Sequence, residues 1–145
     1  MGKKDDLGRV EAGVNRTVLI VDDSASMRQI VRLTLEGVGF AIVEGSNGQE
    51  GLDQLRAHRV QAIISDVNMP VMDGISLVRL VRGLQEYRSL PILLMTTASD
   101  ASRKNQGRVA GANGWIVKPF SPAQLLETLD KVLVKSTDRA ASGQR

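Results

Sequence analysis

The sequence predicts an α/β domain built on a five-stranded parallel sheet. Five short apolar runs recur at regular spacing along the chain, and the segments between them have the periodicity of helices. Strands that alternate with helices usually pair in parallel, so we expect all five strands to form one sheet. At 145 residues the chain is long enough for one domain with a core and too short for two ordinary ones.

The five predicted strands are mostly apolar, which is typical of strands buried on both faces of a sheet. They cover residues 18–21, 41–43, 62–64, 92–95 and 115–117. None of these runs approaches the length of a membrane span. We therefore place them in the core of a globular domain.

The first three predicted helices each present one apolar stripe toward the sheet. The first ends before Gly39, the second follows Asn47, and the third follows Asp73 and Gly74. Their expected core residues are Met27, Ile30, Val31, Leu35 and Val38 in the first, Leu52 and Leu55 in the second, and Leu77, Val78, Leu80 and Val81 in the third.

The last two predicted helices differ in how well their sequences support them. The fourth, within residues 101–110, is polar and basic and has little apolar surface beyond Val109, so we expect it to be weakly held. The last begins with a capping box of Ser121 and Gln124 and has Pro122 at its first position. Its apolar face consists of Leu125, Leu126, Leu129, Val132 and Leu133.

The net charge of +3 comes from the two ends of the chain. Residues 1–16 carry four basic and three acidic groups, residues 135–145 carry three and one, and residues 17–134 carry twelve of each. We therefore expect a domain over residues 17–134, a disordered N-terminal extension over residues 1–16 and a solvated C-terminal tail over residues 135–145. A basic excess confined to the ends argues against DNA binding.

The composition also limits the chemistry and the location of the protein. The chain has no cysteine, which excludes a disulfide framework and a thiolate metal site. Its first residues are polar and contain no apolar segment of a secretory signal. We expect a cytoplasmic protein whose chemistry depends on groups other than thiols, with oxygen ligands as the natural candidates.

Polar and charged residues follow four of the predicted strands. Asp22 and Asp23 follow the first, Asp66 the third, Thr96 the fourth and Lys118 the fifth. In an open parallel sheet, ligands bind at the carboxyl ends of the strands, so we expect these side chains to share one edge.

Three clustered carboxylates repel one another unless a cation lies among them or one is protonated. Oxygen ligands without His or Cys suit Mg²⁺, which prefers octahedral coordination and usually keeps several waters. An aspartate is also a nucleophile toward phosphorus, and a nearby lysine and hydroxyl can bind phosphoryl oxygens. The pattern predicts a metal-assisted phosphoryl acceptor.

Four segments at these strand ends resemble the motifs of the receiver domain of response regulators in bacterial two-component systems. In order they are VLIVDDSASMRQIV, ISDVNMPVMDG, MTTAS and VKPF. The likeness covers residues 17–134 and is greatest to the stand-alone chemotaxis regulators of that family. It implies a doubly wound, flavodoxin-like (βα)5 fold with strand order 2-1-3-4-5.

The resemblance implies which residue accepts phosphate and which hold the metal. Asp66 is the phosphoacceptor, and Asp22 and Asp23 hold Mg²⁺ together with Asp66. Asn68 contributes its backbone carbonyl to the same ion, and Asp23 is the direct carboxylate ligand. Mg²⁺ is the implied cofactor.

The resemblance also implies the parts of a conformational switch. Thr96, rather than Thr97, is the switch hydroxyl, Lys118 contacts the phosphoryl group, and Pro119 follows a cis peptide bond. Trp115 stands where the family usually places a Tyr or Phe that moves with the hydroxyl. Trp115 is larger than either, so the extent of its inward rotation does not follow from the resemblance.

The implied function is a signalling switch that catalyses only its own phosphorylation and dephosphorylation. It takes a phosphoryl group from a histidine kinase of the chemotaxis (CheA-like) type. The surface formed by the fourth helix, fifth strand and last helix then changes its affinity for a partner such as the flagellar motor switch protein. We expect a monomer that binds neither DNA nor membrane.

Other functions are also compatible with parts of the pattern. A stand-alone receiver can be a phosphate sink, a phosphorelay intermediate or a regulator of another motility system. A phosphatase that forms an aspartyl phosphate typically has an acidic residue two positions after the nucleophile, where this chain has Asn68. A nucleotide-binding module is disfavoured because no Gly-rich loop follows the first strand.

Overall fold

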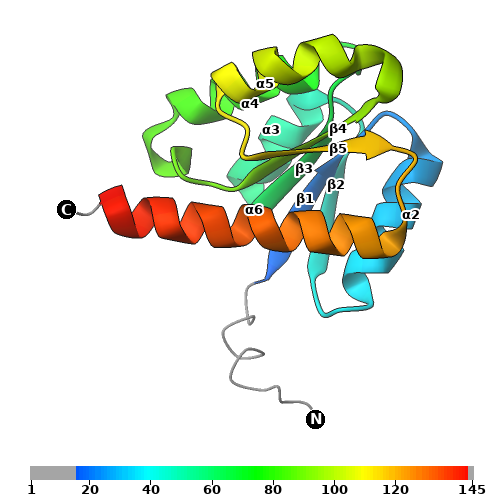
Figure 1. The fold of residues 1–145 in the computed structure, drawn as a ribbon, viewed down its shortest axis with the longest axis horizontal. Coiled ribbons are helices and arrows are strands. Elements are labelled where there is room, and N and C mark those ends of the chain that lie inside the picture. Colours follow the sequence, from blue (N-terminus) through cyan, green and yellow to red (C-terminus); the bar gives the residue numbers. More distant parts are fainter. Residues whose placement is uncertain (1–15, 144–145) are drawn as a thin grey trace.

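The computed structural model describes residues 16–143, apart from the side chains of Ala101 and of residues 135–143. It confirms the predicted sheet, in which the strands are parallel and have the order β2-β1-β3-β4-β5 (Figure 1). The strands are β1 (Thr17–Val21), β2 (Ala41–Gly45), β3 (Ala62–Asp66), β4 (Ile92–Thr97) and β5 (Gly114–Lys118).

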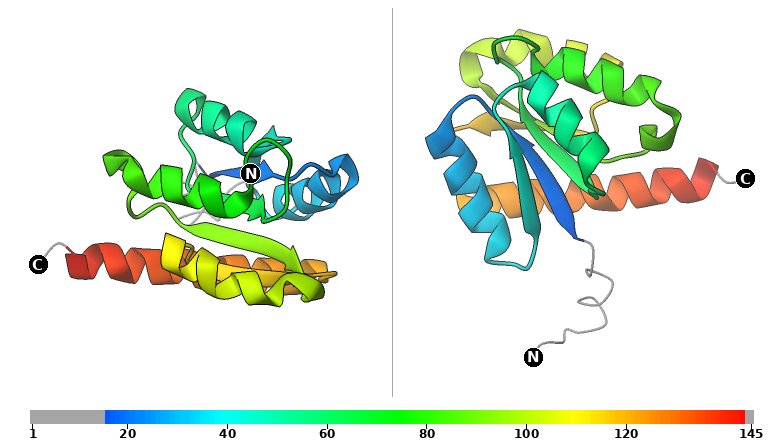
Figure 2. Two further views of the ribbon diagram at one scale, coloured as in Figure 1. Left: turned by 90° about the horizontal axis from the view of Figure 1, so that it is seen from above. Right: turned by 180° about the vertical axis from the view of Figure 1, so that it is seen from behind.

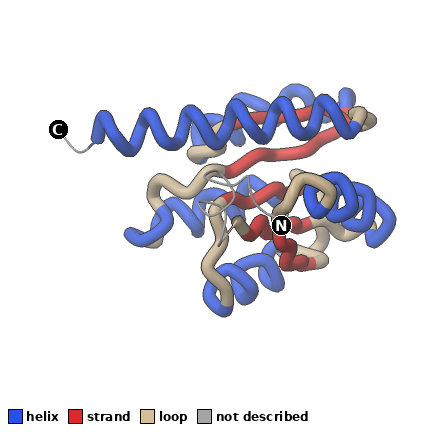
Figure 3. Tube along the Cα trace, turned by 90° about the horizontal axis from the view of Figure 1, so that it is seen from below, coloured by secondary structure: helices blue, strands red, loops and turns tan. Residues whose placement is uncertain are grey.

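Helices cover both faces of the sheet, and Figures 2 and 3 show the strands between them from other sides. One face is covered by α2 (Ala25–Glu36) and α6 (Pro122–Gly143), and the other by α3 (Gly48–Ala57), α4 (Gly74–Gly83) and α5 (Lys104–Ala110). Successive strand residues point to opposite faces. Val18 and Ile20 of β1 therefore pack in the core beneath α2 and α6, whereas Leu19 and Val21 pack in the core beneath α3 and α4.

Polar side chains fix the helix starts that the sequence predicts. At α6 the backbone N–H of Gln124 donates to Ser121 Oγ over 3.1 Å, and the N–H of Ser121 donates to Gln124 Oε1 over 2.8 Å. The capping box is therefore confirmed. Asn47 and Asp73 each cap the helix that follows them in a similar way.

The prediction that all five strands are buried on both faces is wrong for the two outer ones. In β2 only Gly45 is buried, and in β5 only Ile116. These strands form the margins of the sheet, where helices cover them less completely than the central strands. The central β1, β3 and β4 are buried along nearly their whole length.

Several residues predicted to face the core are instead exposed at the surface. In α2, Val31 and Leu35 are fully buried, but Ile30 is 50% exposed because adjacent residues on a helix differ by about 100° in direction. Val38 and Leu80 are each 46% exposed. The core-facing stripes are therefore narrower than the sequence pattern predicts.

The fourth predicted helix consists of two pieces, the 3₁₀ helix η3 (Ala98–Arg103) and α5. Asp100, inside η3, has non-helical dihedral angles, so the two turns of η3 are not continuous. In α5 only Gly107 is buried, and Val109 is 77% exposed. Val109, the apolar residue that the sequence offers, thus faces solvent, and the partly buried Ala110 and the buried Gly107 pack toward the core instead.

The described residues extend past the predicted end of the domain on the C-terminal side, whereas β1 begins at Thr17, the predicted start. The last helix continues past residue 134 to Gly143, so the backbone of the predicted tail is helical as far as that residue. The predicted N-terminal extension lies outside the described residues except for Arg16, whose guanidinium carbon lies 4.1 Å from the centre of the Phe40 ring. Of the helices in the described part, none has the length and apolarity needed to cross a membrane.

Candidate functional site

The predicted acidic residues meet at one edge of the sheet. Asp22 and Asp23 directly follow β1, and Asp66 is the last residue of β3, the neighbour of β1. One carboxylate oxygen from each of the three lies within 4.8 Å of the other two. Asp22 and Asp66 are buried, whereas Asp23 is exposed. The cluster is therefore closed toward the core and open to solvent at Asp23.

Lys118 bridges the two buried carboxylates from the end of β5. Its Nζ lies 3.0 Å from Asp22 Oδ2 and 3.1 Å from Asp66 Oδ1. Burial disfavours the charge of Lys118, but hydrogen bonds and charge contacts with both aspartates outweigh burial and raise its pKa. The ammonium group is therefore charged at neutral pH and offsets part of the acidic cluster.

The environment of Asp66 disfavours its ionised form. Burial, together with the charges of Asp22 and Asp23, raises its pKa from 3.8 to about 6, although Lys118 acts in the opposite direction. Lys118 therefore does not fully offset burial and the two neighbouring carboxylates. A bound divalent cation would relieve the remaining repulsion.

The local backbone holds Asp22 in one orientation. Its Oδ1 accepts a hydrogen bond from the N–H of Ser24 over 2.9 Å, while Oδ2 receives Lys118. The Asp22 carbonyl accepts from Arg28 Nη1 over 2.6 Å. These contacts make Asp22 a fixed charge, whereas the exposed Asp23 is free to extend into solvent toward a partly hydrated ion.

The donor set of this cluster fits Mg²⁺. All three side chains offer carboxylate oxygens, and no His or Cys belongs to the group. The exposed position of Asp23 leaves one side accessible to the waters that Mg²⁺ retains. Asn68, expected to add its carbonyl, lies exposed in the loop that follows β3.

A glycine allows the loop after Asp66 to pack closely. Gly74, the first residue of α4, lies so near the carbonyl oxygen of Asp66 that an added Cβ would collide with it. The N–H of Gly74 also donates to the carbonyl of Val67 over 2.8 Å. The start of α4 is thereby held directly against the end of β3.

Of the two predicted switch residues, Thr96 lies on β4, the strand beside Asp66, and Trp115 on β5. Asp66 pairs in register with Met95 of β4, so Thr96 is the next residue along that strand. Thr96 is 1% exposed, and its hydroxyl has no hydrogen-bond partner among the described residues. A buried hydroxyl without a partner is costly, so Thr96 is poised to bond a new oxygen acceptor.

Trp115 lies one strand farther out and packs against α5. It pairs with Leu94 of β4, and a Cβ added at Gly107 would lie 3.0 Å from the Trp115 ring. Its indole nitrogen is buried without a partner among the described residues. The peptide bond between Lys118 and Pro119 is cis, as the resemblance implies.

The structure also shows a set of contacts that sequence reasoning missed. Arg103 donates from Nη1 to Asn68 Oδ1 over 2.9 Å, and its Nη2 lies 3.4 Å from Asp73 Oδ2. The Asn68 amide in turn donates to Asp100 Oδ2. We call these four residues the Arg103 clamp, because they join the loop after Asp66 to the segment after Thr96.

Nothing in the sequence marks the Arg103 clamp. Its two halves are 27 to 35 positions apart in the chain and follow no fixed spacing. Asp73 was predicted only as the start of a helix, a role it also has, and Arg103 only as part of a basic segment. The clamp depends on the path of η3, which a helical pattern does not predict.

Comparisons with known proteins agree with the fold. The family model of the response regulator receiver domain matches residues 18–130. A chemotaxis protein CheY homolog from Campylobacter jejuni is 38% identical over 127 residues, which are 86% of this chain and 98% of that protein. Chemotaxis protein CheY1 from Helicobacter pylori is 38% identical over 118 residues, 80% of this chain and 95% of that protein.

A solved structure shows the same similarity in three dimensions. The chemotaxis response regulator CheY4 of Vibrio cholerae has 45% sequence identity and a TM-score of 0.77. The match covers 81% of this chain and 98% of that one. The likeness therefore extends over nearly the whole length of that regulator.

Proposed function

Since the chain belongs to the response regulator receiver domain family, we propose that it is a stand-alone regulator that accepts a phosphoryl group on Asp66. The curated relatives support a stand-alone regulator, because the match to this chain covers 98% and 95% of their lengths. The observation that carries the proposal is the Lys118 ammonium, which lies 3.0 and 3.1 Å from the carboxylates of Asp22 and Asp66. A cation this close to the proposed acceptor would also be within reach of a phosphoryl group bound there.

In the proposed reaction the ionised Asp66 carboxylate attacks the phosphorus of a phosphohistidine on a histidine kinase. A bond from Asp66 oxygen to phosphorus forms, and the bond from phosphorus to the histidine nitrogen breaks. Asp22, Asp23 and Asp66, with the Asn68 carbonyl, would hold Mg²⁺, which when bound screens the negative charges that meet at the site. The protein acts on itself and has no separate substrate to turn over.

Lys118 and Thr96 supply the contacts to the product. Lys118 already lies at Asp66 and would pair with a phosphoryl oxygen as it does with the carboxylate. The hydroxyl of Thr96, which has no partner among the described residues, would donate a hydrogen bond to a second phosphoryl oxygen. Trp115 would follow Thr96 inward, and the balance between two conformations of α5 and β5 would shift.

We propose a CheA-like chemotaxis kinase as the donor and the flagellar motor switch as the target, in the cytoplasm. The relatives named as chemotaxis proteins support that pair of partners. Capture of partners with and without beryllofluoride, a phosphoryl mimic, separates motor control from a phosphate sink. A sink would show no partner that depends on beryllofluoride.

The test of the phosphoacceptor is labelling by acetyl phosphate with Mg²⁺, read by intact mass and peptide mapping. The wild-type chain should gain one phosphoryl group on Asp66, and Asp66→Asn should gain none. Asp130→Asn, a matched change at an exposed residue of α6, should label at the wild-type rate. Equal labelling of Asp66→Asn would refute the assignment, and EDTA should stop the reaction in every variant.

A further inference from the structure

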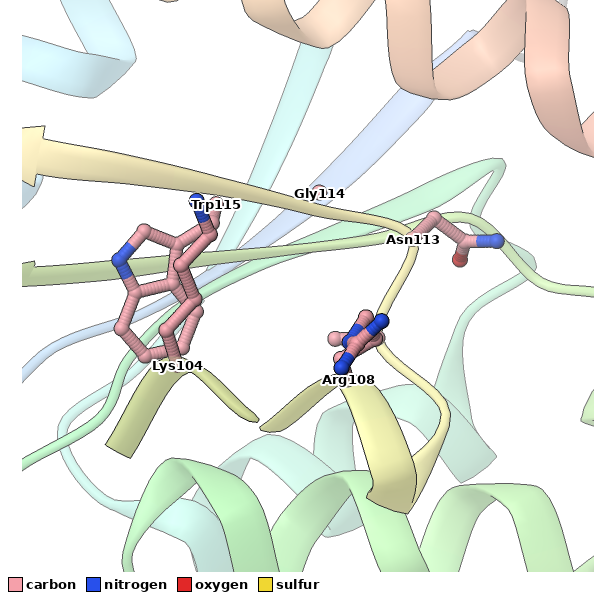
Figure 4. A pocket seen from close by; sticks show the side chains of 6 residues that line it. Lys104, Arg108, Asn113, Gly114 and Trp115 are labelled. Atoms are coloured by element: carbon pink, nitrogen blue, oxygen red, sulfur yellow. The ribbon is translucent and has the colours of Figure 1, made fainter. Parts of the chain in front are cut away.

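A pocket of about 540 Å³ lies at the edge of the sheet opposite Asp66, before β3 and β4 begin. It is formed by the end of α3 and by the segment that follows α4. The lining residues with a part in binding are Leu55, Arg56, Arg59, Val60, Glu86 and Tyr87. The smaller pocket beside Trp115, which Figure 4 shows, is a separate feature at the proposed switch.

Two arginines of the larger pocket have no partner within the described part of the chain. Arg56 and Arg59 are exposed, and neither forms a side-chain hydrogen bond or a salt bridge with a described residue. Arg56 lies in the last turn of α3, where a positive charge suits the helix dipole. Arg59 lies beyond the capping residue His58, so the helix dipole does not account for its position. The two arginines are therefore available to bind an anion.

The apolar residues of the pocket are held in place by the fold. Leu55 and Val60 are only 1% and 8% exposed. Tyr87, the one tyrosine of the chain, lies in the 3₁₀ helix η2 (Gln85–Tyr87) and donates from its hydroxyl to the carbonyl of Leu55 over 3.3 Å. Arg82 Nη1 of α4 donates to the carbonyl of Tyr87 over 2.8 Å. These contacts join η2 to α3 and α4, so the tyrosine ring is fixed beside the two arginines.

The size and the chemistry of this pocket fit a nucleoside monophosphate. Its volume lies within the roughly 300–1,000 Å³ of pockets that hold small organic ligands. Guanidinium groups form paired hydrogen bonds with phosphate, and a tyrosine ring can stack on a planar base. Glu86, the one carboxylate among the lining residues, can accept hydrogen bonds from ribose hydroxyl groups.

An acidic peptide fits the same pocket less well. β3 and β4 are inner strands paired on both sides, so they offer no free edge to an extended peptide. Glu86 would also repel the further carboxylates of such a peptide. A nucleoside monophosphate instead brings one phosphate for the arginines and one flat ring for Tyr87.

We propose that this pocket binds a nucleoside monophosphate, with the phosphate on Arg56 and Arg59 and the base against Tyr87. The pocket lies at the opposite end of β3 from Asp66, so binding does not require phosphorylation. The regulator thereby has a second input besides the proposed modification of Asp66.

The probe is AMP, compared with adenosine and with inorganic phosphate in two-dimensional ¹H–¹⁵N NMR titrations of the full chain in EDTA. AMP should shift the amide signals of residues 55–60 and 85–90 with saturation. Adenosine and phosphate should each bind at least roughly tenfold less tightly, because each lacks one of the two sets of contacts.

Two double variants test the arginines. Arg56→Ala/Arg59→Ala should bind AMP roughly tenfold less tightly, because the hydrogen bonds to the charged phosphate are lost. Lys104→Ala/Arg108→Ala removes two exposed cations of the pocket in Figure 4 and should bind AMP as the wild type does.

Two changes at Tyr87 test the ring. Tyr87→Phe keeps the ring and should bind AMP as the wild type does, whereas Tyr87→Leu should bind it roughly tenfold less tightly. The dispersion of the NMR signals shows whether each variant is folded.

Four results would overturn the inference. They are no shift with AMP, equal binding of AMP and inorganic phosphate, an equal loss in both double variants, and tighter binding of an Asp-rich peptide than of AMP. Asp66→Asn should bind AMP as the wild type does. Failure of the proposed function is distinguishable, because acetyl phosphate would then leave Asp66 unlabelled while AMP still binds.

Discussion

Replacing Asp66 with Asn should stabilise the metal-free protein at neutral pH. The substitution keeps the shape of the side chain and removes one of three clustered negative charges, while Lys118 keeps its contact with Asp22. The pKa of Asp66 rises from 3.8 to about 6 on folding, chiefly through burial and the charge of Asp22. At about 1.4 kcal/mol per pKa unit, ionised Asp66 costs the folded protein about 3 kcal/mol.

The pH dependence of this effect has a definite sign. The folded protein holds a proton on Asp66 more tightly than the unfolded chain does. The cost is therefore absent below about pH 4, grows between pH 4 and 6, and is complete above pH 6. The stability difference between Asp66→Asn and wild type should follow the same course, since both proteins share all other titrating groups.

Urea unfolding in EDTA, at several values of pH, measures this difference. Asp66→Asn should be more stable by about 2 to 3 kcal/mol at pH 7.5 and nearly equal to wild type at pH 4. Mg²⁺ should stabilise the wild type more than the variant and narrow the gap. Asp130→Asn, the control at an exposed position, should change little. A variant no more stable than wild type at pH 7.5 would refute the claim that burial and the neighbouring carboxylates disfavour the ionised form of Asp66.

Three further predictions concern the surroundings of the site. Lys118→Met should destabilise the metal-free protein by about 3 kcal/mol in urea unfolding, because the fully buried Asp22 loses its cation; an unchanged midpoint would contradict this. Arg103→Gln should lower the free energy of unfolding by less than about 1 kcal/mol, yet it should speed amide hydrogen exchange in α5 and not in α4. Equal effects on both helices would count against the Arg103 clamp. Gly107→Ala should lower the free energy of unfolding by about 1–3 kcal/mol and shift the emission of Trp115, since an added Cβ would lie 2.7 Å from a methyl of Leu94. The matched Gly83→Ala, with nothing within 4 Å of the added Cβ, should be neutral or slightly stabilising.

The sequence predicted the strands and helix starts where a single local signal, such as an apolar run or a capping residue, determines them. The apolar runs identified every strand. Asn47, the Asp73-Gly74 pair and the capping box at Ser121 located three helix starts to within one residue. Burial was predicted less well because it depends on position in the sheet. Ile116 of the outer strand β5 is buried while its neighbour Val117 is 41% exposed, a difference that the sequence of the strand does not contain.

Whether a site residue could be predicted also depended on where it lies in the fold. Asp22, Asp66 and Lys118 could be placed together because parallel strands bring their carboxyl ends to one edge. The contacts of Arg103 with Asn68 could not, because they depend on an irregular helix and on rotamers that no pattern specifies. Residues at the ends of regular elements are predictable from the sequence, whereas those that join two loops are not.

The most direct test of the account is the fluorescence of Trp115, the one tryptophan of the chain, titrated first with Mg²⁺ and then with beryllofluoride. Mg²⁺ should change the signal with saturation, and beryllofluoride should then produce a second change that needs the metal. Asp66→Asn should lose the second change, whereas Asp130→Asn should keep both. An equal beryllofluoride response in Asp66→Asn, or no response in the wild type, would contradict a switch that begins at Asp66 and reaches Trp115.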